Sequence, residues 1–171
     1  APVVKDIRVG TQRDVTRIVF EFTDALTARM STLTAPYRVV IDFPEVGWSL
    51  PPRPLPRASG VYKKLRYGLF KPGNTRVVLD LSEPARIRST YMMAPKDAHG
   101  YRLVLELSAT SRAKFLGAKK TGPIKVSFNA HTHVTSQTVS APIKRIRQLP
   151  PPIRAARPEN VHKAVPQMQG R

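Results

Sequence analysis

Four short stretches of the chain place an arginine and a carboxylate four residues apart, with a valine midway between them. They are Arg17-Val19-Glu21, Arg38-Val40-Asp42, Arg76-Val78-Asp80 and Arg102-Val104-Glu106. A guanidinium group can donate paired hydrogen bonds to a carboxylate or to sugar hydroxyls. Carboxylates that lie close together can act as a general acid and a general base. The four arginines and four acids are therefore the first candidates for binding or for catalysis.

Catalysis by these carboxylates is the weaker hypothesis. General acid catalysis needs a carboxyl group with a raised pKa. Each acid here stands four residues from an arginine, on a face that we expect to be open to water. The sequence also lacks a glycine-rich phosphate loop, a nucleophile elbow and a Ser/His/Asp signature. We therefore expect that this chain is not an enzyme.

The sequence predicts no cofactor. The chain has no cysteine, which excludes thiolate metal sites, thiol nucleophiles and disulfides. His131 and His133 would share one face of a strand, but zinc needs a third ligand, and no nearby acid or cysteine supplies one. We interpret both histidines as ordinary polar residues of a loop or tail.

The residues beside the candidate positions predict β-strands. They are apolar or threonine, as in Thr16-Ile18-Phe20-Phe22 and Tyr101-Leu103-Leu105-Leu107. Side chains on a strand alternate between its two faces, so one face is apolar and the other carries the arginine, the valine and the acid. A helix would scatter both sets around its circumference.

The sequence also contains a tandem repeat, with halves at residues 3–44 and 61–108. TRIVFEFTD at residues 16–24 corresponds to TRVVLDLSE at 75–83, and YRVVIDF at 37–43 corresponds to YRLVLEL at 101–107. Two four-stranded units with one apolar face each can bury both faces by packing face to face. Residues 1–116 are therefore predicted to form an all-β domain, a β-sandwich of two pseudo-symmetric four-stranded sheets. A closed barrel is the alternative.

Two proline-rich segments lie outside the repeat halves. Residues 45–60 include Pro51-Pro52-Arg53-Pro54-Leu55-Pro56, which predicts a stiff, extended connector. Residues 117–171 carry 10 Lys/Arg and one acid, against 19 and 10 in residues 1–116, within a net charge of +18. We expect this basic extension to be a largely irregular linker or tail, with at most short strands at 124–128 and 134–139.

The charged faces have two interpretations. Neighbouring antiparallel strands would set arginine opposite acid, and each such pair adds a few tenths of a kcal/mol to stability. Alternatively, each face is a polar binding surface. Aromatic residues that could stack on sugar rings give modest support to binding: Tyr62, Phe70, Tyr91 and Tyr67, although Tyr67 is expected to face the core.

The doubled pattern resembles the AMIN domain over roughly residues 3–108. This domain occurs at the N-terminus of periplasmic N-acetylmuramoyl-L-alanine amidases and in pilus secretins. The resemblance implies a sandwich of two symmetric four-stranded sheets that binds peptidoglycan and directs an amidase to the division septum. It also implies that the binding surface includes Arg17, Glu21, Arg38, Asp42, Arg76, Asp80, Arg102 and Glu106.

One feature of such amidases is missing from the sequence. Their zinc-dependent catalytic domain opens with an Asp-Ala-Gly-His-Gly motif, and nothing similar follows residue 108. The chain therefore resembles the targeting domain and linker alone, and zinc is expected only in the catalytic domain. By resemblance, we expect a periplasmic protein at the division septum, with peptidoglycan and divisome or envelope proteins as partners.

Two other functions remain open. The chain could be an AMIN module of an envelope assembly such as a pilus secretin, in which protein partners matter more than glycan. The basic extension could bind polyanions such as nucleic acid or anionic lipid headgroups, with steep salt dependence. No aromatic residue is interleaved with its basic residues, so specific recognition of nucleic acid is not expected. No apolar run approaches the length of a membrane span.

Overall fold

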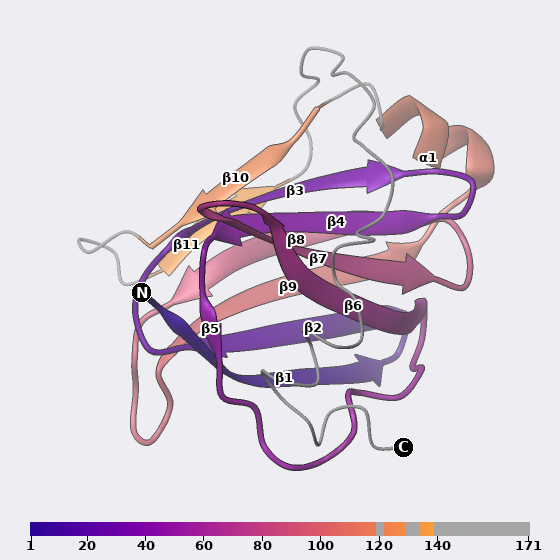
Figure 1. Cartoon of the computed structure of the whole chain (residues 1–171). Helices are drawn as coiled ribbons and strands as arrows, with labels where there is room; N and C mark the ends of the chain where they lie inside the picture. Colours follow the sequence, from indigo (N-terminus) through magenta and orange to yellow (C-terminus); the bar gives the residue numbers. More distant parts are fainter. Residues whose placement is uncertain (119–121, 129–133, 139–171) are drawn as a thin grey trace.

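The structure is a computed structural model that describes residues 1–118 and 122–128 and the backbone of residues 134–138. It has the predicted all-β sandwich, in which two sheets pack face to face (Figure 1). The first repeat half supplies strands β1 Val3–Gln12, β2 Val15–Phe22, β3 Thr27–Leu33 and β4 Arg38–Pro44. The second supplies β6 Tyr62–Lys71, β7 Asn74–Leu81, β8 Ala85–Met93 and β9 Tyr101–Ala109.

The two sheets do not correspond to the two repeat halves. One sheet has the strand order β11-β8-β9-β2-β1-β5, and the other has the order β10-β3-β4-β7-β6. Each therefore joins two strands of the first half to two of the second, which corrects the expectation of one sheet per half. The central four strands of each sheet, β8-β9-β2-β1 and β3-β4-β7-β6, are equivalent by the repeat. The pseudo-symmetry therefore relates one sheet to the other, and each sheet contains one strand pair from each repeat half.

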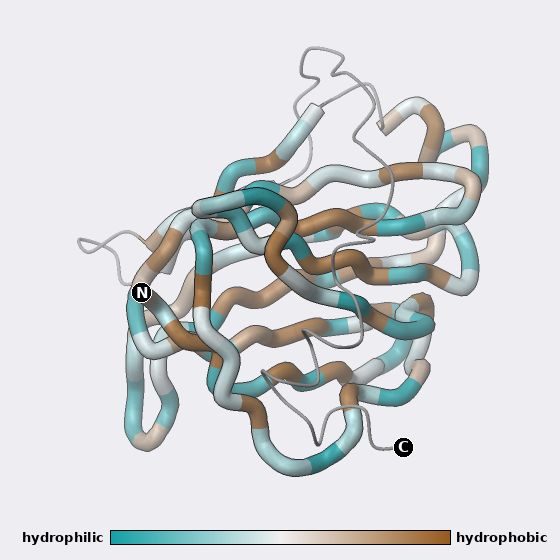
Figure 2. The backbone as a smooth tube through the Cα atoms, viewed as in Figure 1, coloured by the Kyte–Doolittle hydropathy of each residue, from teal (hydrophilic) through white to brown (hydrophobic). Residues whose placement is uncertain are grey.

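The core lies between the sheets and is built from the alternate, apolar residues of the strands. Phe20, Phe22 and Phe43 form its centre, with ring centroids 5.3 to 6.5 Å apart. Figure 2 shows the alternation of apolar and polar residues along the strands that produces this face. Burial of about 25 cal/mol per Å² of apolar surface is the main force that holds the layers together.

The connector, residues 45–60, closes one side of the sandwich. Its first part forms the short strand β5 Gly47–Trp48, which pairs in parallel with β1, and the rest loops past β1 to β6 (Figure 1). Trp48 lies against Tyr67 of β6, with ring centroids 3.8 Å apart. A strand pair and a ring contact therefore fix the connector to both sheets.

Two equivalent threonines hold the two ends of the connector. The hydroxyl of Thr16 accepts a hydrogen bond from the backbone N–H of Val61 at 3.1 Å, and the hydroxyl of Thr75 accepts one from Val46 at 3.1 Å. Both threonines are buried, and each directly precedes an arginine of the candidate site. The repeat thus anchors the segment that joins its own two halves.

The remaining elements follow the second half. The helix α1 Arg112–Ala118 packs Phe115 against Tyr37, and β10 Ile124–Ser127 and β11 Val134–Thr138 extend the sheets beside β3 and β8. The expectations for His131, His133 and residues 141–171 concern positions outside the described residues. No helix in the described part of the chain is long and apolar enough to cross a membrane.

Candidate functional site

The eight candidate residues lie on the central strand pairs of the two sheets. On the outer face of the six-stranded sheet, here called face A, Arg17 is opposite Glu106 and Glu21 is opposite Arg102 across β2 and β9. On the outer face of the five-stranded sheet, face B, the opposed pairs are Arg38 with Asp80 and Asp42 with Arg76, across β4 and β7. The structure therefore brings the eight residues together as two quartets, one on each side of the molecule.

On face B, one arginine is committed to a buried ion pair. Arg76 donates from Nε and Nη2 to the two carboxylate oxygens of Asp42 at 2.7 and 2.9 Å. Its side chain is only 4% exposed, and the ring of Phe70 covers the guanidinium at 3.6 Å. Paired hydrogen bonds and a ring above the cation together fix this side chain.

The other arginine of face B is bonded to the backbone. Arg38 donates to the carbonyl oxygens of Pro36 at 3.0 Å and Thr34 at 3.1 Å. Burial and the nearby charge of Arg66 lower the pKa of Arg38. Asp80, its partner in register, instead accepts from Arg66 at 3.0 Å. Each of the four candidate residues of face B is thus held by a hydrogen bond to a neighbouring side chain or to the backbone.

The expectation that both faces are open to water is wrong for face B. Arg38 and Arg76 are 6% and 3% exposed, and Val40 and Val78 are buried with Leu33 in a second small apolar cluster. Phe70 covers Arg76 on this face. This face is therefore mainly the cross-strand pairing that the first interpretation describes.

Face A is more open at one end. Arg17 donates from Nε and Nη2 to Glu106 at 3.0 and 2.6 Å, yet its side chain is 57% exposed. Ser89 donates to the other oxygen of Glu106 at 2.7 Å. Burial opposes ionisation of Glu106, but the hydrogen bonds from Ser89 and Arg17 and the charges of Arg17 and Arg88 lower its pKa. Glu106 is therefore a fixed anion and unsuited to donate a proton.

The other end of face A is covered by the turn between β8 and β9. Glu21 accepts a hydrogen bond from the backbone N–H of Gly100 at 2.6 Å and lies 3.3 Å from the ring nitrogen of His99. Arg102 donates to the carbonyl oxygen of Ala94 at 3.4 Å. Glu21 and Arg102 therefore hold this turn in place.

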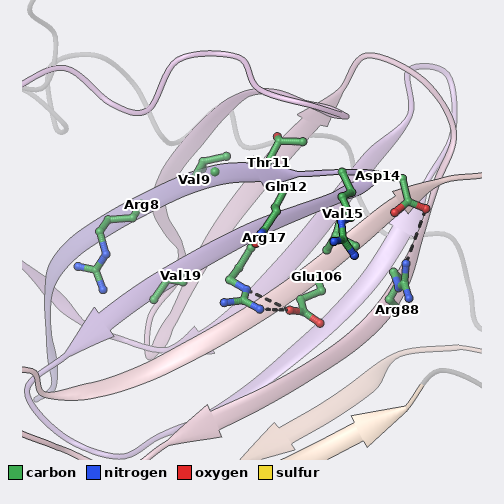
Figure 3. A pocket seen from close by; sticks show the side chains of 12 residues that line it. Arg8, Val9, Thr11, Gln12, Asp14, Val15, Arg17, Val19, Arg88 and Glu106 are labelled. Carbon is green, nitrogen blue, oxygen red and sulfur yellow. Dashed lines mark hydrogen bonds and ion pairs between the residues drawn. The ribbon is translucent and has the colours of Figure 1, made fainter.

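A hollow of about 750 Å³ lies at the open end of face A (Figure 3). Arg8, Arg17, Arg88 and Glu106 line it from β1, β2, β8 and β9, and the β1–β2 turn forms its end. Arg17 and Glu106 meet across its floor, and Arg88 lies 3.8 Å from Asp14 at its rim. The volume is within the range of about 300–1,000 Å³ typical of ligand pockets.

One position of the repeat distinguishes the surroundings of Arg17 and Arg76. Phe70 on β6 covers Arg76, and the corresponding position on β1 is Gln12, which lines the hollow beside Arg17. An aromatic ring covers the arginine on face B, and among the described residues no ring covers Arg17 on face A. The repeat therefore carries one closed and one open copy of the same charged arrangement.

The comparison with known families agrees with this repeated architecture. The family described as AMIN domain matches residues 6–105, which include all eight candidate positions except the last, Glu106. The chain belongs to the AMIN domain family. No curated protein matches the chain. AMIN domains are non-catalytic, peptidoglycan-associated modules of cell-envelope proteins. The resemblance noted from the sequence is thereby confirmed.

The sequence interpretation overlooked one further arginine beside each quartet of this AMIN domain. Arg8 approaches Glu21 at 3.6 Å on face A, and its repeat equivalent Arg66 binds Asp80 on face B. The repeat could have identified both, because Ile7-Arg8-Val9-Gly10 matches Leu65-Arg66-Tyr67-Gly68. Arg88 could not be identified from the alternation of residues, because it reaches face A through a bulge of β8 between Ile87 and Ser89.

The aromatic residues suggested for sugar stacking are mostly occupied elsewhere in this AMIN domain. Tyr62 is buried and donates its hydroxyl to the carbonyl oxygen of Pro56 at 2.9 Å. Tyr67 faces the core as expected, and Phe70 lies over Arg76. Burial raises the pKa of both Tyr62 and Tyr67. Tyr91 alone of the four is partly exposed without a ring contact among the described residues.

The arrangement suits binding more than chemistry. Within the described residues, no group of three or more His, Asp or Glu side chains is placed to hold a metal ion. The carboxylates of both faces accept hydrogen bonds from arginines or from the backbone. Ionised carboxylates that accept such bonds fix the orientation of the neighbouring arginines. The exposed arginines of face A are then the groups available to a ligand.

Proposed function

We propose that this AMIN domain is a non-catalytic module that binds peptidoglycan and targets a cell-wall amidase to the septum for murein cleavage during cell division. Family membership supports association with peptidoglycan in the envelope. The amidase, the septum and a periplasmic location come from the resemblance of the repeated motifs to the AMIN domains of such enzymes.

The observation that carries the proposal is the hollow of face A. It is lined by exposed arginines, and Arg17 is 57% exposed although it is paired with Glu106. An exposed arginine held by a carboxylate is pre-oriented, so it loses little freedom when a ligand binds. Accessible guanidinium groups in a hollow can donate paired hydrogen bonds to polar groups of a bound polymer.

The eight candidate residues have different parts in this proposal. Arg17 and Glu106 lie in the hollow and would contact the ligand, and Arg8 and Arg88 join them there. Glu21 and Arg102 would shape the site through the turn that they hold. The residues that would stiffen the opposite sheet, because they are hydrogen-bonded within face B, are Arg38, Asp42, Arg76 and Asp80.

The test is co-sedimentation of the purified chain with peptidoglycan sacculi. The wild type is expected to pellet, and the double variant Arg17→Ala/Arg88→Ala is expected to lose most of its pelleting. The matched control is Arg29→Ala/Arg57→Ala, which removes the same charge from exposed positions, one on face B and one on the connector. Circular dichroism confirms that each variant is folded.

Three results would contradict the proposal. Absence of pelleting by the wild type would refute peptidoglycan binding. Equal loss in the control variant would show attraction to net charge alone. Unchanged pelleting of Arg17→Ala/Arg88→Ala would exclude face A. As a second readout, a fluorescent fusion exported to the periplasm should collect at the septum, and uniform fluorescence would refute septal targeting.

A further inference from the structure

The hollow of face A has a composition that selects among the chemical parts of peptidoglycan. Its described lining residues include four arginines but only two acids, so it carries an excess of positive charge; the arginines are Arg8, Arg13, Arg17 and Arg88, and the acids are Asp14 and Glu106. One of the acids, Glu106, is already paired with Arg17 and Ser89. A neutral sugar gains little from such a surface, whereas an anion gains attraction from several directions.

The arginines of the hollow retain free hydrogen-bond donors, which also favours an anionic ligand. Among the described residues, Arg17 uses only Nε and Nη2, and the Nη2 groups of Arg8 and Arg88 make no hydrogen bond. The side chains of Arg8 and Arg88 are 38% and 39% exposed. A carboxylate can accept two parallel hydrogen bonds from one guanidinium group, and charge-assisted bonds of this type are the strong ones.

The uncharged lining residues argue against recognition of a sugar ring. The apolar side chains on the Arg17 side of the hollow are Val15 and Val19, whereas Val9 packs against the core, and no aromatic residue is among the described lining residues. Carbohydrate rings are commonly held by stacking on aromatic rings, which this hollow does not offer. Valine side chains instead suit small aliphatic groups such as the methyl group of alanine.

We propose that this hollow binds a carboxylate of the peptide part of peptidoglycan, with Arg17 and Arg88 as the main ligands of that carboxylate. The inference rests on the proposed function and adds to it the component recognised. The peptide stems carry free carboxylates next to alanine methyl groups, whereas the N-acetylated sugars of the glycan are uncharged. The hollow of about 750 Å³ accommodates several peptide residues.

The closing experiment measures binding of defined fragments to the full chain by NMR, observed at the arginine side-chain N–H groups and the backbone. The probes are a stem tetrapeptide with free carboxylates, the same peptide with its carboxylates amidated, and an uncharged tetramer of N-acetylglucosamine. A peptide-free glycan that bears lactyl carboxylates tests the other source of a carboxylate. Pelleting with sacculi is measured in parallel.

The free tetrapeptide is expected to shift the signals of Arg17 and Arg88. Amidation is expected to weaken binding at least about tenfold, which corresponds to about 1.4 kcal/mol. Arg17→Ala and Arg88→Ala should each lose the shifts at the hollow, and Arg29→Ala should retain them. The uncharged sugar tetramer should leave the hollow unchanged.

The outcomes separate this inference from the proposed function. Equal binding of the free and amidated peptides, or binding of the sugar tetramer in the hollow, would overturn the inference while pelleting with sacculi still supported peptidoglycan binding. Stronger binding of the lactyl-bearing glycan would overturn the assignment to the peptide. Absence of pelleting by the wild type would refute the proposed function itself.

Discussion

Arg17 and Arg76 occupy the same position of the two repeats, and both form two hydrogen bonds to an acid on the neighbouring strand. Their surroundings decide their roles. Arg76 is almost completely buried beneath Phe70, whereas Arg17 is more than half exposed at the edge of a hollow. Breaking a buried ion pair is strongly destabilising, whereas an exposed ion pair contributes little to stability. Arg17 therefore remains available to a ligand.

We therefore expect Arg76→Ala and Arg17→Ala to differ in their effect on stability. Arg76→Ala removes one partner of a buried ion pair and leaves Asp42 without its paired donors, which is expected to lower the free energy of unfolding by about 3 kcal/mol or more. Arg17→Ala breaks an exposed pair and is expected to cost less than about 1 kcal/mol. Urea denaturation of both variants measures the difference.

The comparison is matched because both substitutions remove the same side chain from the same repeat position. Equal losses of stability for the two variants would contradict the division of the faces into a structural and a ligand-binding one. The pelleting assay provides the complementary measurement, since Arg17→Ala should weaken binding at little cost in stability.

At the scale of elements, the connector and the turns determine which parts of each face are accessible. The turn between β8 and β9 covers Glu21 and Arg102, and the connector is held at its ends by Thr16 and Thr75. Gly60 lies next to the first of these anchors, with a φ of +56°. A Cβ atom at this position would overlap the hydroxyl of Thr16.

Gly60→Ala is accordingly expected to be more destabilising than Gly73→Ala. Both glycines have positive φ, which costs an alanine about 1–2 kcal/mol. At Gly73 a Cβ atom has open space, whereas at Gly60 it would displace the Thr16 hydroxyl that accepts from Val61. Thermal unfolding of the two variants isolates the steric contribution, and equal melting temperatures would contradict the role of this anchor.

For the whole molecule, the exchange of strands between the repeat halves is the main structural result. The pair β2 and β9 and the pair β4 and β7 each join the first half to the second, so every candidate quartet is shared between the halves. Neither half can build a complete sheet or a complete charged face alone. The repeat thus specifies one cooperative domain.

Separate halves are therefore expected not to fold. Fragments 1–60 and 61–128 should each lack a cooperative thermal transition in circular dichroism, because each would expose the apolar edges of two unpaired strand pairs. Mixing them should restore β-structure and a transition, since they contain all strands of the central sheets. A cooperative transition in either fragment alone would contradict the exchange.

Much of this architecture could be predicted from the sequence. The alternation of residues identified the strands and their buried faces, and the repeat indicated a pseudo-symmetric sandwich. Periodicity reports only which face of a strand is buried, because side chains alternate independently of the neighbouring strand. It therefore indicated the eight candidate residues but could not indicate which strands pair.

The tertiary structure alone decided the pairing and the accessibility of the charges. Strand exchange places Arg17 opposite Glu106, 89 residues away, and a long-range contact of this kind has no local signal. The repeat made the two faces look equivalent. The difference between Gln12 and Phe70 became meaningful only when the structure placed Gln12 in the hollow with Arg17, and Phe70 over Arg76. The sequence by itself determined an AMIN sandwich with two charged faces. Packing determined that one of them is open, because exposure depends on which distant side chains come to lie above each residue.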